Sequence, residues 1–220
     1  MSKKFLITAL IVGCLLGAGS IAYREIFPSG MWRYKITVNI ESPEGTKSGS
    51  AIREVRLKRN LAKILNPDVS SVDIDTFGEA VVINLGENKF LFSIISNEFL
   101  DAFPEGSTLN NKIKLYNDLP INEPKPIRVD DYPWFVNFEK LDDPTSIRTI
   151  NSSNISNIFG QGFSIKSVVI EKTDASITNG QLKIALPWLG HLPVGTGRAI
   201  PGNTDQAKYL NYENFIKSEQ

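Results

Sequence analysis

Residues 32–41, WRYKITVNIE, alternate strictly between apolar and polar side chains. One set is apolar (Tyr34, Ile36, Val38, Ile40), and the other is polar or charged (Arg33, Lys35, Thr37, Asn39, Glu41). Successive side chains of a β-strand point to opposite faces, so this period of two predicts a strand with one buried face. The SPEG turn at 42–45 and the extended run at 46–57 then predict an antiparallel hairpin, in which Gly49 indicates a bulge or a close backbone approach.

Strand patterns recur along the rest of the chain. Two pieces within 72–85 meet at Gly78, and a tight turn leads into 89–96, so the hairpin at 78–96 is the best candidate for the core. Further strands are predicted at 134–141, 146–150, 163–172 and 181–186, and short helices at 58–65, 152–159 and 205–217. The segment 109–116 fits either a strand or a helix. Twelve prolines and sixteen glycines argue against a helical bundle. We therefore predict an α+β fold, a β-rich and mostly antiparallel sheet domain with a few short helices.

An uncharged apolar run of nineteen residues precedes this domain, beginning at Phe5 and ending at Tyr23. A helix of this length crosses about 30 Å of hydrocarbon, and it pairs its own backbone groups as hydrocarbon requires. Lys3 and Lys4 precede the run, which favours an N-terminus in the cytoplasm. The run therefore predicts one N-terminal transmembrane helix, an uncleaved signal anchor, with the lipid bilayer as its partner.

Two other interpretations of the run stay open. The small residues of Ser20-Ile21-Ala22 would allow a signal peptidase to cut after Ala22. The sequence IVGC, which ends at Cys14, resembles a bacterial lipobox in which the thiol takes a lipid, although the residues after it remain apolar. All three interpretations place the following residues outside the cytoplasm. Because Cys14 is the only cysteine, those residues have no internal disulfide.

The predicted organisation has four parts. Residues 1–25 form the signal anchor, 26–31 a spacer, 32–190 the exported β-rich domain, and 191–220 a loop with a C-terminal surface helix. The chain balances 24 basic against 24 acidic residues. No strong field therefore draws it to nucleic acid, and we predict no nucleic-acid partner.

Patterns for catalysis or metal binding are sparse. His191 is the only histidine, which excludes a centre built from several histidines, and its LGHLP context favours a surface or packing role over a catalytic one. The GTGR sequence at 195–198 lacks the ending of a phosphate-binding loop. The sequence assigns no catalytic residue, no cofactor or cofactor-binding residue and no metal ligand.

The acidic pairs and the aromatic residues are the remaining candidates for a site. A glycosidase needs two carboxylates across one cleft, and neither the pair Asp73 and Asp75 nor the pair Asp142 and Asp143 meets that need by spacing alone. Asp143 before a proline is typical of a turn. Five aromatic residues would suit a sugar or a partner groove: Trp32, Tyr34, Tyr132, Trp134 and Trp188. We expect Trp32 at the membrane interface and Tyr34, Trp134 and Trp188 in the core, so a packing role is favoured for them.

Several segments resemble a family of uncharacterised bacterial proteins. The shared segments are WRYKITV from Trp32, SPEG and SGS from Ser42 and Ser48, GEA from Gly78, Tyr132-Pro133 with Phe138, DPTSI from Asp143, Phe159-Gly160, and LPWL from Leu186. The resemblance covers most of 32–190 and implies a bacterial origin and an apolar N-terminus ahead of one β-rich domain. It implies no activity and no site residue.

These observations favour a non-catalytic envelope protein. We expect a single-pass protein of the bacterial inner membrane, with its C-terminal domain in the periplasm, that binds an envelope protein or assembly. The alternative is a carboxylate-dependent hydrolase of envelope polymers that uses Asp73, Asp75, Asp142 or Asp143. Converging carboxylates in a deep cleft would favour the hydrolase, whereas dispersed carboxylates and an exposed apolar surface would favour the binding protein. A pocket lined by the aromatic residues would indicate a ligand-binding module.

Overall fold

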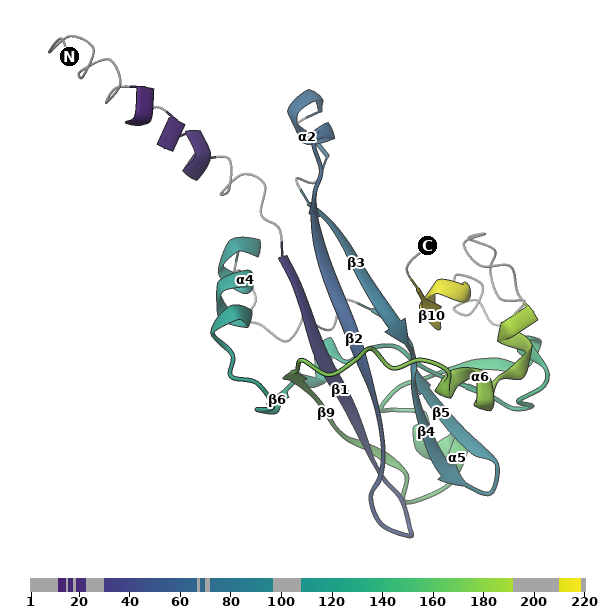
Figure 1. Ribbon diagram of the computed structural model, residues 1–220. Helices are drawn as coiled ribbons and strands as arrows, with labels where there is room; N and C mark the ends of the chain where they lie inside the picture. The colour runs from purple at the N-terminus through teal and green to yellow at the C-terminus, as the bar shows by residue number, and fades with distance from the viewer. Residues whose placement is uncertain are drawn as a thin grey trace, which may run out of the picture.

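The computed structural model describes residues 12–14, 16–17, 19–22, 30–66, 68–69, 72–96, 108–191 and 210–218. Figure 1 shows a β-rich domain with a few short helices around two antiparallel sheets. The strand order is β10-β3-β2-β1-β9-β6 in the six-stranded sheet and β4-β5-β7-β8 in the four-stranded sheet. The predicted α+β, mostly antiparallel fold is confirmed for these residues.

The six-stranded sheet is built around the predicted hairpin. Strand β1 (Gly30–Glu41) pairs with β2 (Lys47–Arg59) along almost its whole length, from Gly30 opposite Leu57 to Ile40 opposite Lys47. The connecting turn closes through two backbone hydrogen bonds between Ser42 and Gly45. The alternation of β1 is confirmed, since the side chains at 34, 36, 38 and 40 are fully buried and their neighbours are not.

A single extended segment then joins the two sheets. Strand β3 (Val72–Glu79) pairs with β2, and β4 (Val81–Gly86) continues after Ala80 but pairs with β5 (Lys89–Ser93). The sequence predicted two strand pieces in this segment; the change of partner comes at Ala80 rather than at Gly78. Gly49 of β2 is the predicted close approach, because a Cβ there would lie 2.3 Å from the carbonyl oxygen of Val82.

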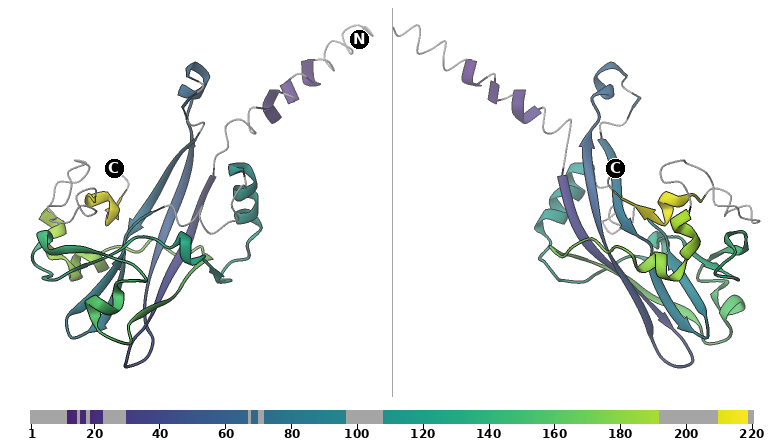
Figure 2. Two further views of the ribbon diagram at one scale, coloured as in Figure 1. Left: turned by 180° about the vertical axis from the view of Figure 1, so that it is seen from behind. Right: turned by 45° about the vertical axis from the view of Figure 1, so that its right-hand side comes forward.

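The other strands complete the sheets. The four-stranded sheet adds β7 (Phe135–Phe138) and β8 (Ile147–Ile150). The six-stranded sheet adds β9 (Ser164–Lys172), the two-residue β6 (Lys125–Pro126), and β10 (Ile216–Lys217), which pairs with the end of β3. In Figure 2 the two sheets lie against each other, and the β2–β3 hairpin extends beyond them with α2 (Ala62–Leu65) at its tip.

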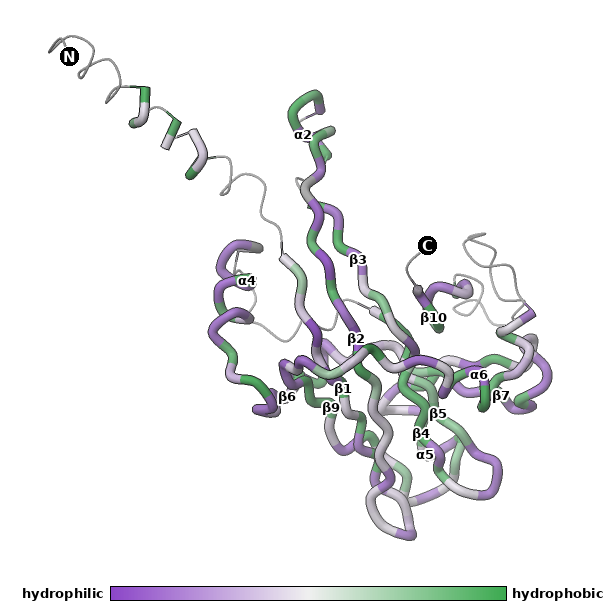
Figure 3. Tube along the Cα trace, viewed as in Figure 1, coloured by the Kyte–Doolittle hydropathy of each residue, from purple (hydrophilic) through white to green (hydrophobic). Residues whose placement is uncertain are grey.

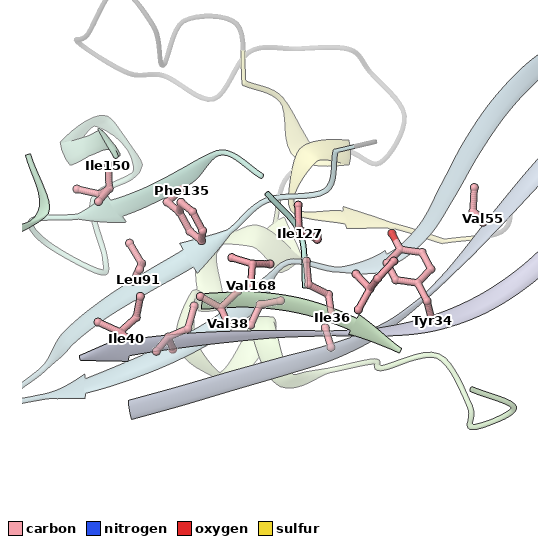
Figure 4. Close-up of a cluster of buried hydrophobic side chains, with 14 of the residues drawn as sticks. Tyr34, Ile36, Val38, Ile40, Val55, Leu91, Ile127, Phe135, Ile150 and Val168 are labelled. Carbon is pink, nitrogen blue, oxygen red and sulfur yellow. The ribbon is translucent and has the colours of Figure 1, made fainter. Parts of the chain in front are cut away.

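Two apolar clusters make up the core. The first lies between the sheets and includes the apolar side of β1 with Leu91, Phe135 and Val168 (Figure 4). The second covers the outer face of the four-stranded sheet and contains Phe92, Phe138 and Phe215. The 78–96 hairpin therefore contributes to both clusters, and β1 lies at the centre of the first.

Short helices close the ends of these layers. Helix α4 (Leu109–Asp118) settles the ambiguity at 109–116 in favour of a helix, and its Tyr116 is buried in the first cluster. Helix α5 (Ile155–Phe159) ends at Gly160, as predicted. Helix α6 (Gln181–Ala185) and the 3-10 helix η3 (Pro187–His191) cover the second cluster. The described residues also include the 3-10 helices η1 (Val129–Asp131), η2 (Pro144–Ser146) and η5 (Tyr212–Asn214).

Three predictions about secondary structure are wrong. Residues 181–186 form α6 rather than a strand, because the Glu79 carboxylate accepts hydrogen bonds from the backbone N–H groups of Gly180 and Leu182 and caps that helix. The surface helix at 205–217 is absent where the structure describes it, since residues 210–217 form η5 and β10 and bury Phe215 and Ile216. The helix at 58–65 is limited to α2, because β2 continues to Arg59.

The predicted transmembrane run lies largely outside the described residues. Of the segment from Phe5 to Tyr23, residues 12–14, 16–17 and 19–22 are described, and they are helical and exposed. Among the described parts of the chain, no helix is both long and apolar enough to cross a membrane. The spacer at 26–31 overlaps the first two residues of β1.

Candidate binding site

The four candidate carboxylates do not meet in one place. Asp73 and Asp75 belong to β3 in the six-stranded sheet, whereas Asp142 and Asp143 lie in the turn between β7 and β8 of the other sheet. Neither of the two cavities described below is lined by any of the four.

Asp75 and Asp143 are engaged in structural interactions. The Lys217 ammonium lies 2.7 Å from one Asp75 oxygen, and its hydrogen bond holds the pKa of that carboxyl below its ordinary value. This pair ties β10 to β3. Asp143 accepts hydrogen bonds from the hydroxyl and the backbone N–H of Thr145, which lower its pKa and fix the start of η2. The turn role predicted for Asp143 is confirmed.

The other chemically notable residues of the sequence are also placed. His191 is exposed at the end of η3, and Cys14 is exposed in the N-terminal segment. In the described part of the chain, no three His, Cys, Asp or Glu side chains gather in a way that would hold a metal ion. Metal coordination therefore gives no candidate site among these residues.

A charged cavity of about 380 Å³ is lined by residues of β1, β2 and the end of β9. Its lining includes Trp32, Glu54 and Lys172. Burial raises the pKa of Glu54, but hydrogen bonds from Arg33 and Arg56 outweigh this and hold it below its ordinary value. The Glu54 carboxylate is thus already clamped between two guanidinium groups, at 2.8 Å and 2.6 Å, as a structural ion pair.

Trp32 belongs to the wall of this cavity and not to an exposed interface. Its indole is 9% exposed, donates a hydrogen bond to Asn117, and meets the Tyr116 ring edge-on at 5.4 Å. The expectation that Trp32 lies at a membrane surface is therefore wrong. The indole packs β1 against α4 instead.

The second cavity is uncharged, has both apolar and polar walls, and brings together parts of both sheets. Its volume is about 320 Å³. It is lined by η1 and the segment after it, by the end of β8 and by the start of β9 (Val129, Tyr132, Pro133, Trp134, Phe135, Thr149, Ile150, Asn151, Ser152, Ile165). None of these lining side chains carries a charge. We call this cavity the Trp134 pocket.

Trp134 is the most exposed aromatic residue of the pocket wall. Its side chain is 53% exposed and Val129 beside it is 62% exposed. Its backbone is nevertheless fixed, because its carbonyl oxygen accepts a hydrogen bond of 3.0 Å from the N–H of Ile94. The core position expected for Trp134 is therefore wrong, since the residue lies just before β7 and outside its paired register.

The other walls of the pocket are also held in place. The Tyr132 ring packs edge-on against Phe135, and the Arg128 guanidinium donates to Asp131 at 2.6 Å across η1. On the opposite side, Asn154 donates its side-chain amide to the carbonyl oxygen of Thr149. This hydrogen bond occupies part of the free edge of β8. The Thr149 carbonyl oxygen on that edge is therefore already occupied.

The chemistry of the Trp134 pocket suits an apolar group with a polar margin. Ligand pockets commonly have volumes of about 300–1,000 Å³, so this one is of the size of a side chain or a single ring rather than a large cofactor. Aromatic and aliphatic walls would bury such a group, and the Thr149, Asn151 and Ser152 side would bind a neighbouring polar group. Tryptophan is among the residue types enriched at binding hot spots.

The sequence indicated only part of this pocket. Tyr132 and Trp134 were among the five aromatic candidates, whereas Tyr34 is buried in the first cluster, as expected. Trp188 packs against Phe138 at the second cluster and donates to the carbonyl oxygen of Leu141. Val129 and Ile165 were not foreseen, because they come from segments that only the fold brings together.

Comparison with protein-family models, with curated proteins and with solved structures finds no match for this chain. The site must therefore be interpreted from its own geometry.

Proposed function

We propose that this chain is a membrane-anchored, non-catalytic envelope protein, and that its Trp134 pocket binds an apolar side chain of a partner protein. The main support for this proposal is the pocket itself. Half-exposed Trp134 and exposed Val129 line an uncharged cavity of about 320 Å³. Exposed apolar side chains beside a formed cavity are typical of interaction sites. The separation of the acidic pairs onto two sheets also favours binding over the carboxylate-dependent hydrolysis that we considered.

The proposed location depends on the N-terminal run. Its described residues include Val12, Leu16 and Ile21, which are 48%, 70% and 66% exposed and so leave their apolar surface available to lipid. We assign the run from Phe5 to Tyr23 as a single membrane span and the domain as periplasmic, in the inner membrane of a bacterium.

Site-specific photo-crosslinking in intact cells tests the binding proposal. A photoreactive amino acid at position 134 is expected to give a discrete crosslinked product with an envelope protein. The matched control is position 184 on α6, because Ile184 is also apolar and is 83% exposed but does not line the pocket. Position 184 is expected to give no such product.

A pocket-filling variant makes the test specific. Ser152 is exposed at the rim, so the substitution Ser152→Trp fills the cavity without disturbing the core. It is expected to remove the product formed at position 134. Equal crosslinking at 134 and 184, or a product that persists in Ser152→Trp, would contradict the proposed site.

A further inference from the structure

The tip of the β2–β3 hairpin carries apolar side chains that the domain does not cover. Leu61, Ile64 and Leu65 are 56%, 65% and 90% exposed. Their spacing places them on one side of α2, and no residue of α2 is buried. Figure 3 shows these hydrophobic positions at the far end of the hairpin, next to hydrophilic ones.

The tip lies at the end of the domain where the chain enters from the N-terminal run. Gly30, the first residue of β1, pairs with Leu57 of β2, and β2 continues to Arg59 beyond that point. At about 3.3 Å per residue, the tip at Leu61 reaches roughly 13 Å past the level of Gly30. A fully extended chain from Tyr23 to Gly30, seven residues apart, spans at most about 25 Å. The tip is therefore within reach of the surface from which the run would emerge.

The charge of the tip also fits a lipid surface. Residues 58–69 contain Lys58, Arg59, Lys63 and Asp68, and Asp73 of β3 lies opposite Lys58 in the hairpin, so this end carries an excess of one positive charge. Lys58 additionally lies 3.6 Å from Asp75 at the base of the hairpin. Apolar side chains flanked by lysine and arginine are the composition of segments that insert into the headgroup region of anionic membranes.

We infer that the α2 tip is a second membrane contact, which inserts Leu61, Ile64 and Leu65 into the interface of an anionic lipid surface. This inference rests on the proposed membrane anchor and extends it. The anchor alone attaches the domain to the bilayer at one point. Two contacts at one end of the β1–β2–β3 sheet fix its orientation and hold the opposite end, with the 42–45 turn, away from the bilayer (Figure 2).

Fluorescence of the full-length protein in vesicles tests the inference. Cys14 is the only cysteine, so Cys14→Ser allows one label at a chosen site. An environment-sensitive dye is attached through Leu65→Cys, or through Glu44→Cys in the distant turn as the matched control. The proteins are reconstituted into vesicles of phosphatidylcholine and phosphatidylglycerol, with or without nitroxide-labelled lipid.

We expect a blue-shifted emission at position 65 that the nitroxide lipid quenches, and neither effect at position 44. Ile64→Asp, an exposed change that leaves the core intact, should reduce the shift at position 65. If the dye at position 65 emits as it does in water while the protein still floats with the vesicles, the tip contact is wrong. The membrane anchor is not contradicted by that result. A blue shift without quenching would also overturn the tip contact, since a protein would then cover the tip. Protein that fails to float would contradict the anchor as well.

Discussion

Substitution of the buried Arg53 tests how the two sheets are held together. Arg53 lies on the core side of β2, between Ala51 and Val55, and it is fully buried. Its guanidinium donates hydrogen bonds to the carbonyl oxygens of Glu79 at 3.0 Å and Ser93 at 2.8 Å, with a longer one of 3.4 Å to Ile94. Arg53 therefore connects the junction between β3 and β4 to the end of β5 by hydrogen bonds.

The cost of losing this side chain follows from those contacts. Arg53→Met keeps an apolar stem but leaves the three carbonyl oxygens without this donor. A buried acceptor left without its donor costs about 1–3 kcal/mol, and the Glu79 and Ser93 oxygens are the two close partners, so we expect a loss of about 4 kcal/mol in total. Domains are stable by about 5–15 kcal/mol, so we expect the substitution to remove about a quarter or more of the free energy of unfolding.

Urea unfolding of the full-length protein in detergent, followed by tryptophan fluorescence, measures this loss. With a dependence of about 2 kcal/mol per molar urea, the midpoint should fall by about 2 M. The control is Arg148→Met, because the Arg148–Glu139 pair is about half exposed and should contribute at most about 1 kcal/mol. If Arg53→Met and Arg148→Met shift the midpoint equally, the role given to Arg53 is wrong.

Two further predictions concern the contacts between elements. Gly49→Val places a side chain against the carbonyl oxygen of Val82, where even a Cβ would lie at 2.3 Å. The resulting overpacking should lower the free energy of unfolding by about 1–3 kcal/mol or more in the same urea assay. An unchanged midpoint would show that the sheets separate easily there. Asp75→Asn removes the pair with Lys217 and should cost up to about 1 kcal/mol at neutral pH, because both groups are partly exposed. Since the pKa of Asp75 is held below its ordinary value of 3.8, its contribution is present above that value and lost as the pH falls through the lower folded-state pKa. Wild type and Asp75→Asn should therefore unfold alike in strong acid, and a difference that persists there would contradict the assigned pair.

Strand β1 was predictable because its two faces differ. Strand β1 has one apolar and one polar side, and burial of the apolar side is sufficient to fix both its extent and its orientation. The turn at 42–45 was predictable because Pro and Gly impose its backbone locally. In both cases the information lies within a few residues.

The features that the sequence did not predict depend on distant partners. Helix α6 forms where a strand was expected because the Glu79 carboxylate, about a hundred residues earlier, binds its first N–H groups. The C-terminal segment is buried because Phe215 and Ile216 join the second cluster. Trp134 follows the alternation of the strand after it but precedes the first paired residue of β7, so periodicity alone placed it wrongly in the core.

The candidate site has the same limitation. Tyr132 and Trp134 were recognisable as aromatic candidates, but the pocket also needs Thr149 from β8 and Ile165 from β9. No local pattern links these segments. A charged side chain such as Arg53 at a core position of an alternating strand was the visible signal of a long-range contact, although it does not say where the contact is made.

The most direct test of the proposed function is the affinity of the purified full-length protein for the partner that position 134 crosslinks. Truncation of a hot-spot aromatic residue costs about 2 kcal/mol or more, so Trp134→Ala should weaken binding by about 30-fold. Ile184→Ala, which removes an equally accessible apolar side chain outside the pocket, should leave the affinity unchanged. If Trp134→Ala binds as tightly as the wild-type protein, the Trp134 pocket is not the binding site.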